Sequence, residues 1–246
     1  MEKSDKMVVG DFSVKIKRKK NLKNLYIKVI PPEGDVEVTA PISVEDEEIR
    51  LFLLKRMSEI IKVKSKMKKQ ERQSKREYVS GESHYVWGKL YRLQVIHQDG
   101  KSNIVKTPTK LIMTIPEDTS RESRERLMNN WYRKELVRVL ESVIPSCEEK
   151  ARIYGNEYKI KNMKTKWGSC NIDKKTIWIN LQLAKKPIEC LEYVLFHELI
   201  HFIERNHTDM FYSLMEKLYP TYRDVKNSLD TMPLESMKSG VENDNV

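Results

Sequence analysis

Three of the five histidines of this 246-residue chain fall within eleven consecutive positions, as His197, His201 and His207. The first two flank Glu198 in the order His-Glu-Leu-Ile-His. Residues four positions apart lie on one face of an α-helix, one turn from each other, so both imidazoles can reach one metal ion if this stretch is helical. The spacing therefore predicts a helix here, and it constrains the fold more than any other feature of the sequence.

His207 lies ten residues after His197 and six after His201. In a continuous helix its side chain would point about 120° away from that of His201, because each residue turns by about 100°. The helix should therefore end between these two histidines, and Asn206 is a plausible left-handed residue just past a helix end. We expect the chain to fold back at that point and bring His207 to the same metal as a third ligand.

This arrangement is suited to metal-assisted hydrolysis. A zinc ion lowers the pKa of a bound water to about 7 and polarises a peptide carbonyl, and catalytic zinc sites keep three protein ligands and one open position. Glu198 is not a ligand in this scheme but a general base beside His197, which takes a proton from the water. The alternative is an amphipathic core helix that carries two exposed histidines by chance.

Alternation of apolar and polar residues predicts strands, since such a strand buries one face and leaves the other in water. Most of this pattern lies in the first half of the chain. The expected strands lie near residues 12–17, 25–29, 36–38, 85–95, 111–115, 154–161 and 176–181.

Four helices are expected where apolar residues recur at helical spacing. They would begin at Ser43, Thr119, Pro187 and Thr208. The first two of these residues are followed three positions later by an acidic residue, as in a capping box. The first helix would continue through Ile60, and Pro145 would end the second, because proline does not continue a helix.

These elements predict an α+β fold. Residues 1–116 would form a β-rich N-terminal half with a helix, and residues 117–230 a mostly helical, zincin-like catalytic half with a short sheet. The polar residues 231–246 are expected to be a disordered tail. We see no internal repeat in the sequence.

The cysteine content and the lengths of the apolar runs indicate the cellular compartment of the protein. The three cysteines, Cys147, Cys170 and Cys190, are widely spaced and form no CxxC pair, which disfavours a disulfide framework or a cysteine zinc knuckle. Cys170 is expected to have a structural role near the metal site. No apolar run has the length of a membrane span or a signal peptide. We therefore expect a cytoplasmic protein that does not insert into membranes.

The net charge of +10 and two lysine-rich stretches, 15–23 and 62–76, leave two interpretations open. The stretches are either solvated surfaces or a surface that follows the phosphates of a nucleic acid without reading its sequence.

Several separate motifs together resemble the YgjP-like metallopeptidase family, which is related to the SprT-type zinc peptidases. The residues that carry the resemblance are Met163–Cys170, Asn180-Leu181, Pro187, Tyr193–His201, Asn206-His207-Thr208 and Phe211. The similarity extends over about residues 12–225. It implies a zinc peptidase that acts on proteins or peptides, with His197, His201 and His207 as zinc ligands and Glu198 as the catalytic residue.

Two positions depart from the family pattern, which usually has Arg where this chain has Lys166 and Ser where it has Thr208. The histidine spacing equals that of metzincin peptidases, but those have Gly where Glu204 stands, which argues against that family. SprT-type relatives act on proteins near DNA, so a DNA-linked role is implied by analogy alone.

Two other classes of function compete with a peptidase. In a zinc-stabilised, nucleic-acid-associated binding module without peptidase activity, the zinc would need a fourth protein ligand, and no well-placed Cys or His supplies one. A nuclease would more often use carboxylate-bound magnesium or two metals, and the sequence contains no such cluster.

Overall fold

The computed structural model describes residues 4–20, 22–30, 34–69, 76–163 and 166–231. They form two compact units, which are divided between residues 72 and 73. Each unit is described by itself below.

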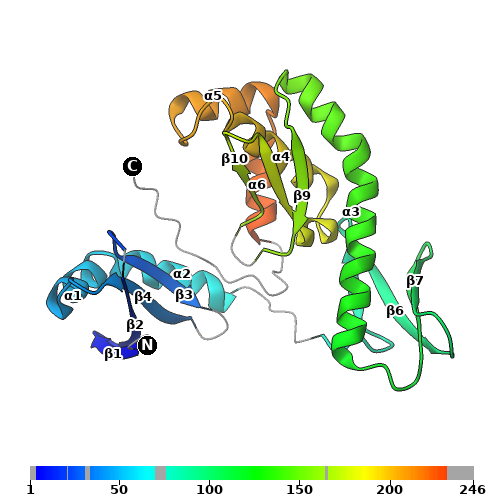
Figure 1. Cartoon of the computed structure of the whole chain (residues 1–246), viewed down its shortest axis with the longest axis horizontal. Helices are drawn as coiled ribbons and strands as arrows, with labels where there is room; N and C mark the ends of the chain where they lie inside the picture. Colours follow the sequence, from blue (N-terminus) through cyan, green and yellow to red (C-terminus); the bar gives the residue numbers. More distant parts are fainter. Residues whose placement is uncertain (1–3, 21, 31–33, 70–75, 164–165, 232–246) are drawn as a thin grey trace. The chain divides into compact units, whose positions relative to one another are not determined.

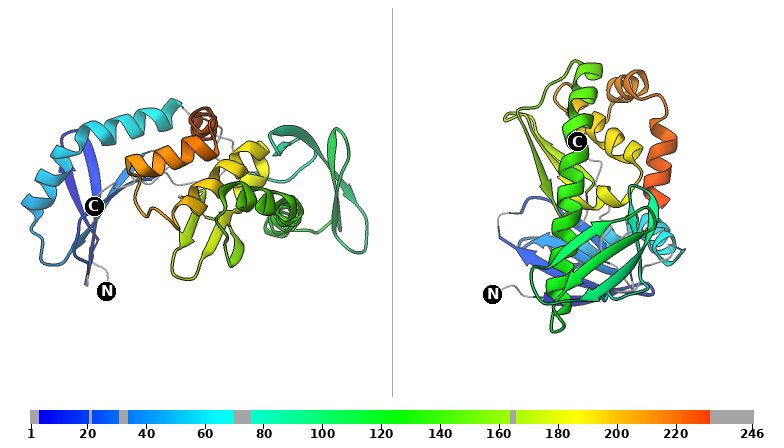
Figure 2. Two further views of the ribbon diagram at one scale, coloured as in Figure 1. Left: turned by 90° about the horizontal axis from the view of Figure 1, so that it is seen from above. Right: turned by 90° about the vertical axis from the view of Figure 1, so that its right-hand side faces the viewer.

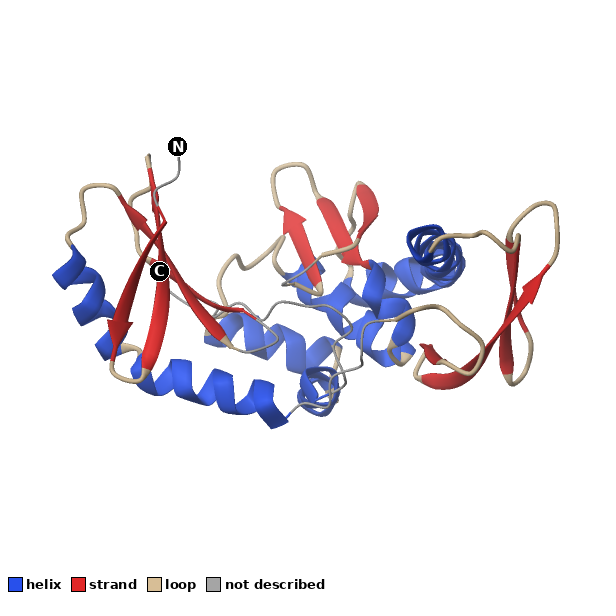
Figure 3. Ribbon diagram, turned by 90° about the horizontal axis from the view of Figure 1, so that it is seen from below, coloured by secondary structure: helices blue, strands red, loops and turns tan. Residues whose placement is uncertain are grey.

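The first unit is a four-stranded sheet covered by two helices. Its elements are β1 (Ser4–Val9), β2 (Phe12–Lys19), β3 (Tyr26–Ile30), β4 (Asp35–Pro41), α1 (Asp46–Lys55) and α2 (Met57–Lys69). The strand order is β1-β2-β4-β3, with β2 and β4 parallel and the other neighbours antiparallel. Both helices lie along one face of the sheet (Figure 3). The core between them includes Val14, Ile16, Val36, Val38, Ile49 and Leu53.

The first helical segment differs from the prediction in two ways. It begins at Asp46, and its N-cap is Glu45, which makes no side-chain cap hydrogen bond, so the capping box at Ser43 is wrong. The segment is also two helices that meet at Arg56, whose backbone N–H donates to the carbonyls of Phe52 and Leu53. An interruption of one residue hardly changes the apolar spacing, so periodicity alone does not reveal it.

The second unit opens with another four-stranded sheet, formed by β5 (Ser83–Val86), β6 (Lys89–His97), β7 (Asn103–Lys106) and β8 (Lys110–Ile115). Its order is β5-β6-β8-β7, again with the second and fourth strands parallel and the other pairs antiparallel. In both units a helix begins five residues after a proline, α1 after Pro41 and α3 after Pro116. The connectivity of the first sheet is thus repeated in the second, although no internal repeat is visible in the sequence.

Helix α3 (Arg121–Ala151) lies between this second sheet and helix α4 (Ile188–Ile200) (Figure 2). Its N-cap is Ser120, whose hydroxyl accepts from the N–H of Ser123, rather than Thr119. The helix continues through Pro145, which was predicted to end it. Val143 and Cys147 on either side of this proline are both buried in the core. We attribute the continuation to their burial, which offsets a cost of about 3 kcal/mol for an interior proline.

The remainder of the second unit is a short sheet packed on helices. The strands are β9 (Glu157–Lys161), β10 (Gly168–Asn171) and β11 (Thr176–Asn180), in the order β10-β11-β9. The helices after them are η1 (Leu181–Lys185), α4, α5 (Asp209–Leu218) and α6 (Tyr222–Thr231). Figure 1 shows β10 and β9 beside α4. Residues of α3, α4 and the β5–β8 sheet belong to one hydrophobic core.

The fold is a mixed α+β fold, as predicted. The boundary expected at residue 116 falls between β8 and α3, inside the second unit, because both elements contribute to the same core. The expected tail lies outside the described residues except for Thr231, as do positions 70–75 of the second lysine-rich stretch. None of the helices in the described part of the chain combines the length and apolarity that crossing a bilayer requires.

Candidate metal centre

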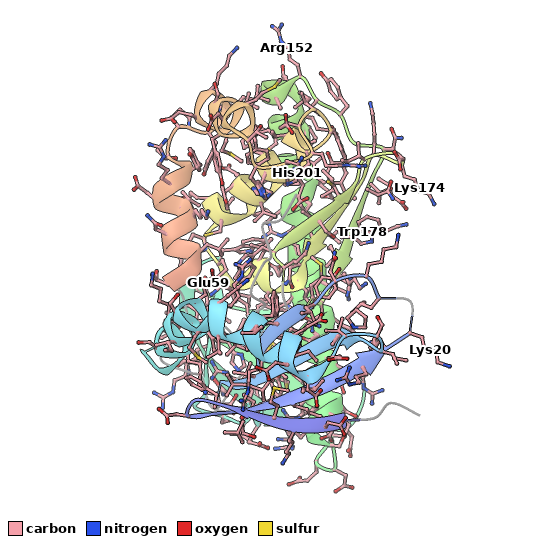
Figure 4. The ribbon with its side chains drawn as sticks, turned by 90° about the vertical axis from the view of Figure 1, so that its left-hand side faces the viewer. Lys20, Glu59, Arg152, Lys174, Trp178 and His201 are labelled. Carbon is pink, nitrogen blue, oxygen red and sulfur yellow. The ribbon has the colours of Figure 1, made fainter. Side chains whose placement is uncertain are left out.

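Helix α4 is buried along most of its surface and carries the first two candidate ligands. Val194, Leu195 and Leu199 belong to the core of the unit. His197 and His201 come from the same face, as the sequence predicts, and their Nε2 atoms lie 3.2 Å apart. His201 is the C-cap of the helix, and its side chain lies at the end of the α4 ribbon (Figure 4).

The chain reverses direction directly after α4. The N–H groups of Phe202 and Ile203 donate to carbonyls three residues earlier, at 3.0 and 2.8 Å, which closes a tight turn. Asn206 does not have the positive φ predicted for it, so the left-handed turn is wrong, and the tight turn makes the reversal instead. Thr208 then caps α5, its Oγ1 accepting from the N–H of Phe211.

His207 lies between this turn and α5, and its Nε2 is 3.0 Å from Nε2 of His197. The ligand nitrogens of all three histidines lie within 4.8 Å of one another. In a tetrahedral zinc site with Zn–N bonds of about 2.05 Å, neighbouring nitrogens would be about 3.3 Å apart. The two separations from Nε2 of His197, 3.0 and 3.2 Å, are close to this value, and the third nitrogen pair lies within 4.8 Å.

Hydrogen bonding supports the same interpretation. Nδ1 of His201 lies 3.1 Å from the carbonyl oxygen of Glu204, and by donating to it this nitrogen leaves Nε2 with a lone pair. Nε2 of His197 makes two close contacts, and a single ring N–H could satisfy only one of them as a hydrogen bond. A metal cation, in contrast, would attract the lone pairs of all three imidazoles. The donor set is therefore better suited to a metal than to hydrogen bonds among the histidines.

The three imidazoles share an aromatic neighbour that the sequence indicated only through the family resemblance, without a role. The ring of Phe211, on α5, lies 5.0, 4.9 and 4.7 Å from the rings of His197, His201 and His207. Its side chain is 1% exposed. Phe211 thus packs against every candidate ligand and limits its rotation. The signal in the sequence was the place of Phe211 in the family resemblance.

Electrostatics keep the histidines in the form that binds metals. Burial, together with the neighbouring imidazoles, lowers the pKa of His197 to about 3. Burial likewise lowers the pKa of His201, and the nearby cation Lys166 acts in the same direction on both. At neutral pH these imidazoles are uncharged and can coordinate a metal.

Glu198 follows His197 on α4, and its side chain is 5% exposed. It faces strand β10, where Gly168 and Cys170 contact it. Cys170 therefore lies next to the candidate general base, although its Sγ does not belong to the candidate metal group in the described residues.

The two remaining histidines lie apart from this group. His97 is exposed at the end of β6, whereas His84 is a 1% exposed residue of β5 whose ring stacks on that of Tyr78. Burial, with the cations Arg76 and Lys185, lowers the pKa of His84 to about 3. Neither belongs to the candidate metal-ligand group found among the described residues.

His84 should make the metal-free protein sensitive to acid. Between pH 6.5 and 3 the unfolded chain protonates this side chain and the folded chain does not, so stability falls as the pH falls through this range. The loss should be about 1.4 kcal/mol per pH unit. Urea denaturation between pH 7 and 4 would measure it. His84→Leu should show a shallower pH dependence than the wild type, His97→Leu should not, and equal slopes for the wild type and His84→Leu would refute this role.

A helix that presents two histidines to one point, followed by a turn that returns a third, defines a candidate mononuclear metal centre of the kind used by metal-dependent hydrolases. The family model of the YgjP-like metallopeptidase domain matches residues 23–232. The chain belongs to this family, and the resemblance found in the sequence is confirmed. It is therefore a metallopeptidase whose substrates are proteins or peptides.

Two solved structures are similar to parts of the chain. The metallopeptidase zymogen of Pyrococcus abyssi abylysin is 18% identical, with a TM-score of 0.36, and aligns with 40% of this chain and 98% of its own. The zymogen of Methanocaldococcus jannaschii jannalysin is 23% identical, with a TM-score of 0.33, and aligns with 37% of this chain and 92% of its own. No curated protein sequence matches the chain.

Proposed function

We propose that this metallopeptidase is zinc-dependent, with His197, His201 and His207 as the metal ligands and Glu198 as the general base. The observation that carries the proposal is the convergence of three imidazole nitrogens, two of them 3.0 and 3.2 Å from Nε2 of His197. Three nitrogen ligands with an open fourth position are typical of catalytic zinc, whereas magnesium and calcium prefer oxygen ligands.

In this mechanism each residue would have a separate role in peptide-bond hydrolysis. Zinc, when bound, polarises the scissile carbonyl and lowers the pKa of a water to about 7. Glu198 accepts a proton from the attacking water and delivers it to the leaving amine. The backbone carbonyl of Glu204 holds the tautomer of His201, and Phe211 holds the rings in place. Because the attacking group is water, no covalent intermediate is expected.

Two further features belong to this proposal. We assign the zincin-like catalytic region to residues 117–230, since α4, α5 and the β9–β11 sheet all lie within it. We also assign the protein to the reducing cytoplasm, which is supported by its three free cysteines.

The binding-module alternative is weaker. A purely structural zinc site would have four protein ligands, whereas the metal-ligand group found among the described residues has three. The family match concerns a peptidase domain and does not support contact with nucleic acid.

The test is chelator-sensitive proteolysis by the purified full chain. An unfolded protein such as reduced casein should be cleaved, 1,10-phenanthroline should stop the cleavage, and added zinc should restore it. Elemental analysis of the same sample should find one zinc per chain. Cleavage that survives complete removal of the metal would contradict the proposal.

A further inference from the structure

Strand β10 runs along helix α4 at the turn that carries Glu198. Among the described residues it is an edge strand, paired with β11 on one side. Side chains alternate along a strand, so positions 168 and 170 share one face while Ser169 lies on the other. Gly168 and Cys170 both contact Glu198, which identifies their shared face as the one that meets α4.

Gly168 lies so close to Glu198 that a side chain would not fit. A Cβ atom built on it would lie 2.7 Å from Oε1 and 2.9 Å from Cγ of Glu198, and 2.8 Å from Cγ1 of Val194. Real Cβ atoms essentially never approach other heavy atoms closer than 3.0 Å. The φ of Gly168 is not in the left-handed region, so the backbone itself would accept alanine. Glycine is needed here for space rather than for conformation.

Cys170 makes the second contact from the same face. Its thiol is hydrogen-bonded to the carboxylate of Glu198. Burial, followed by the charge of Glu198 and this hydrogen bond, raises the pKa of Cys170 to about 12. The group is therefore a neutral S–H that donates to the carboxylate, and not a thiolate nucleophile.

We propose that β10 positions the general base: Gly168 allows the backbone to pack directly against the Glu198 side chain, and the Cys170 thiol holds one orientation of its carboxylate. Both are positioning residues that act through Glu198. This inference rests on the proposed function, because it concerns how its base is held. A carboxylate fixed at two points does not need to find its reactive orientation in each catalytic cycle.

Loss of either contact should lower kcat and leave KM unchanged, unlike a substitution that weakens substrate binding. Gly168→Ala should lower kcat by about 10- to 100-fold, since a displacement of about 1 Å costs that much. Cys170→Ala should lower kcat by about tenfold through loss of a hydrogen bond to a charged group. In both variants KM and zinc content should stay close to wild type, because neither residue is a metal ligand.

Two further variants separate positioning from general packing. Cys170→Ser retains a donor and should keep more of kcat than Cys170→Ala. Ser169→Ala alters the same strand on its other face and should retain the wild-type kcat. Equal losses in Cys170→Ser and Cys170→Ala, or a loss in Ser169→Ala as large as that in Gly168→Ala, would overturn the proposal.

A measurement of stability tests the Gly168 contact without any assay of activity. Gly168→Ala should lower the melting temperature more when it is introduced into the wild type than when it is introduced into the Glu198→Ala variant. The Glu198→Ala variant lacks the Cγ and Oε1 atoms with which the new Cβ would collide. Equal losses in the two backgrounds would refute the contact.

Full cleavage by Glu198→Gln would overturn the proposed function. An inactive Glu198→Gln together with a wild-type kcat in Gly168→Ala and Cys170→Ala would overturn this inference alone.

Discussion

Glu198→Gln should abolish measurable peptide cleavage while one zinc remains bound per chain. The amide has nearly the same shape as the carboxylate but cannot take a proton from water, and loss of a general base costs about 10²- to 10⁴-fold in rate. Zinc should stay because its candidate ligands are the three imidazoles, whose nitrogens lie within 4.8 Å of one another. The rate of casein cleavage and the zinc content should be measured on the same preparation.

The matched control is Glu189→Gln, which makes the same change on the same helix at an exposed position in the first turn of α4. It should cleave at the wild-type rate. Cleavage by Glu198→Gln at a rate close to that of this control would eliminate Glu198 as the base. Loss of zinc from Glu198→Gln would instead make Glu198 a ligand.

His207→Ala should weaken zinc binding severely. The wild type should contain one zinc per chain, and the variant should bind zinc more than about 100-fold less tightly, since even residues that only orient metal ligands cost 10- to 100-fold. The remaining pair, His197 and His201, is held by α4 and should still bind weakly. Dialysis against competing chelators, followed by elemental analysis, measures the difference.

His97→Ala serves as the control, because it removes an exposed histidine outside the candidate group. Its zinc affinity should equal that of the wild type. Equal retention by His207→Ala and His97→Ala would show that His207 is not a ligand. A wild type that takes up no zinc would leave α4 as a core helix with two histidines by chance.

The candidate metal site could be proposed from the sequence because its signals are local. Helical spacing places His197 and His201 on one face, and the number of residues to His207 requires the helix to end first. The exact form of that ending could not be predicted. Asn206 was a reasonable left-handed residue, but hydrogen bonds from Phe202 and Ile203 close a tight turn before it.

The errors in the predicted fold arise where a long-range contact competes with a local preference. Pro145 normally ends a helix, yet the burial of Val143 and Cys147 in the common core accompanies its continuation. The division at residue 116 follows a change in local pattern, and the elements on its two sides, β8 and α3, contribute to one core.

The sequence alone determined the class of the protein and the residues proposed to hold its metal, because ligand type and helical spacing are properties of a few adjacent positions. Cys170 was expected near this site, but only the tertiary structure decided which groups the neighbouring residues contact. Phe211 packs against all three imidazoles, and Gly168 and Cys170 contact Glu198 from a strand that lies 28 residues or more before it in the chain. The similarity between the two four-stranded sheets is likewise seen only in the order and direction of their strands. Such contacts depend on how distant segments pack, and no local pattern of residues encodes them.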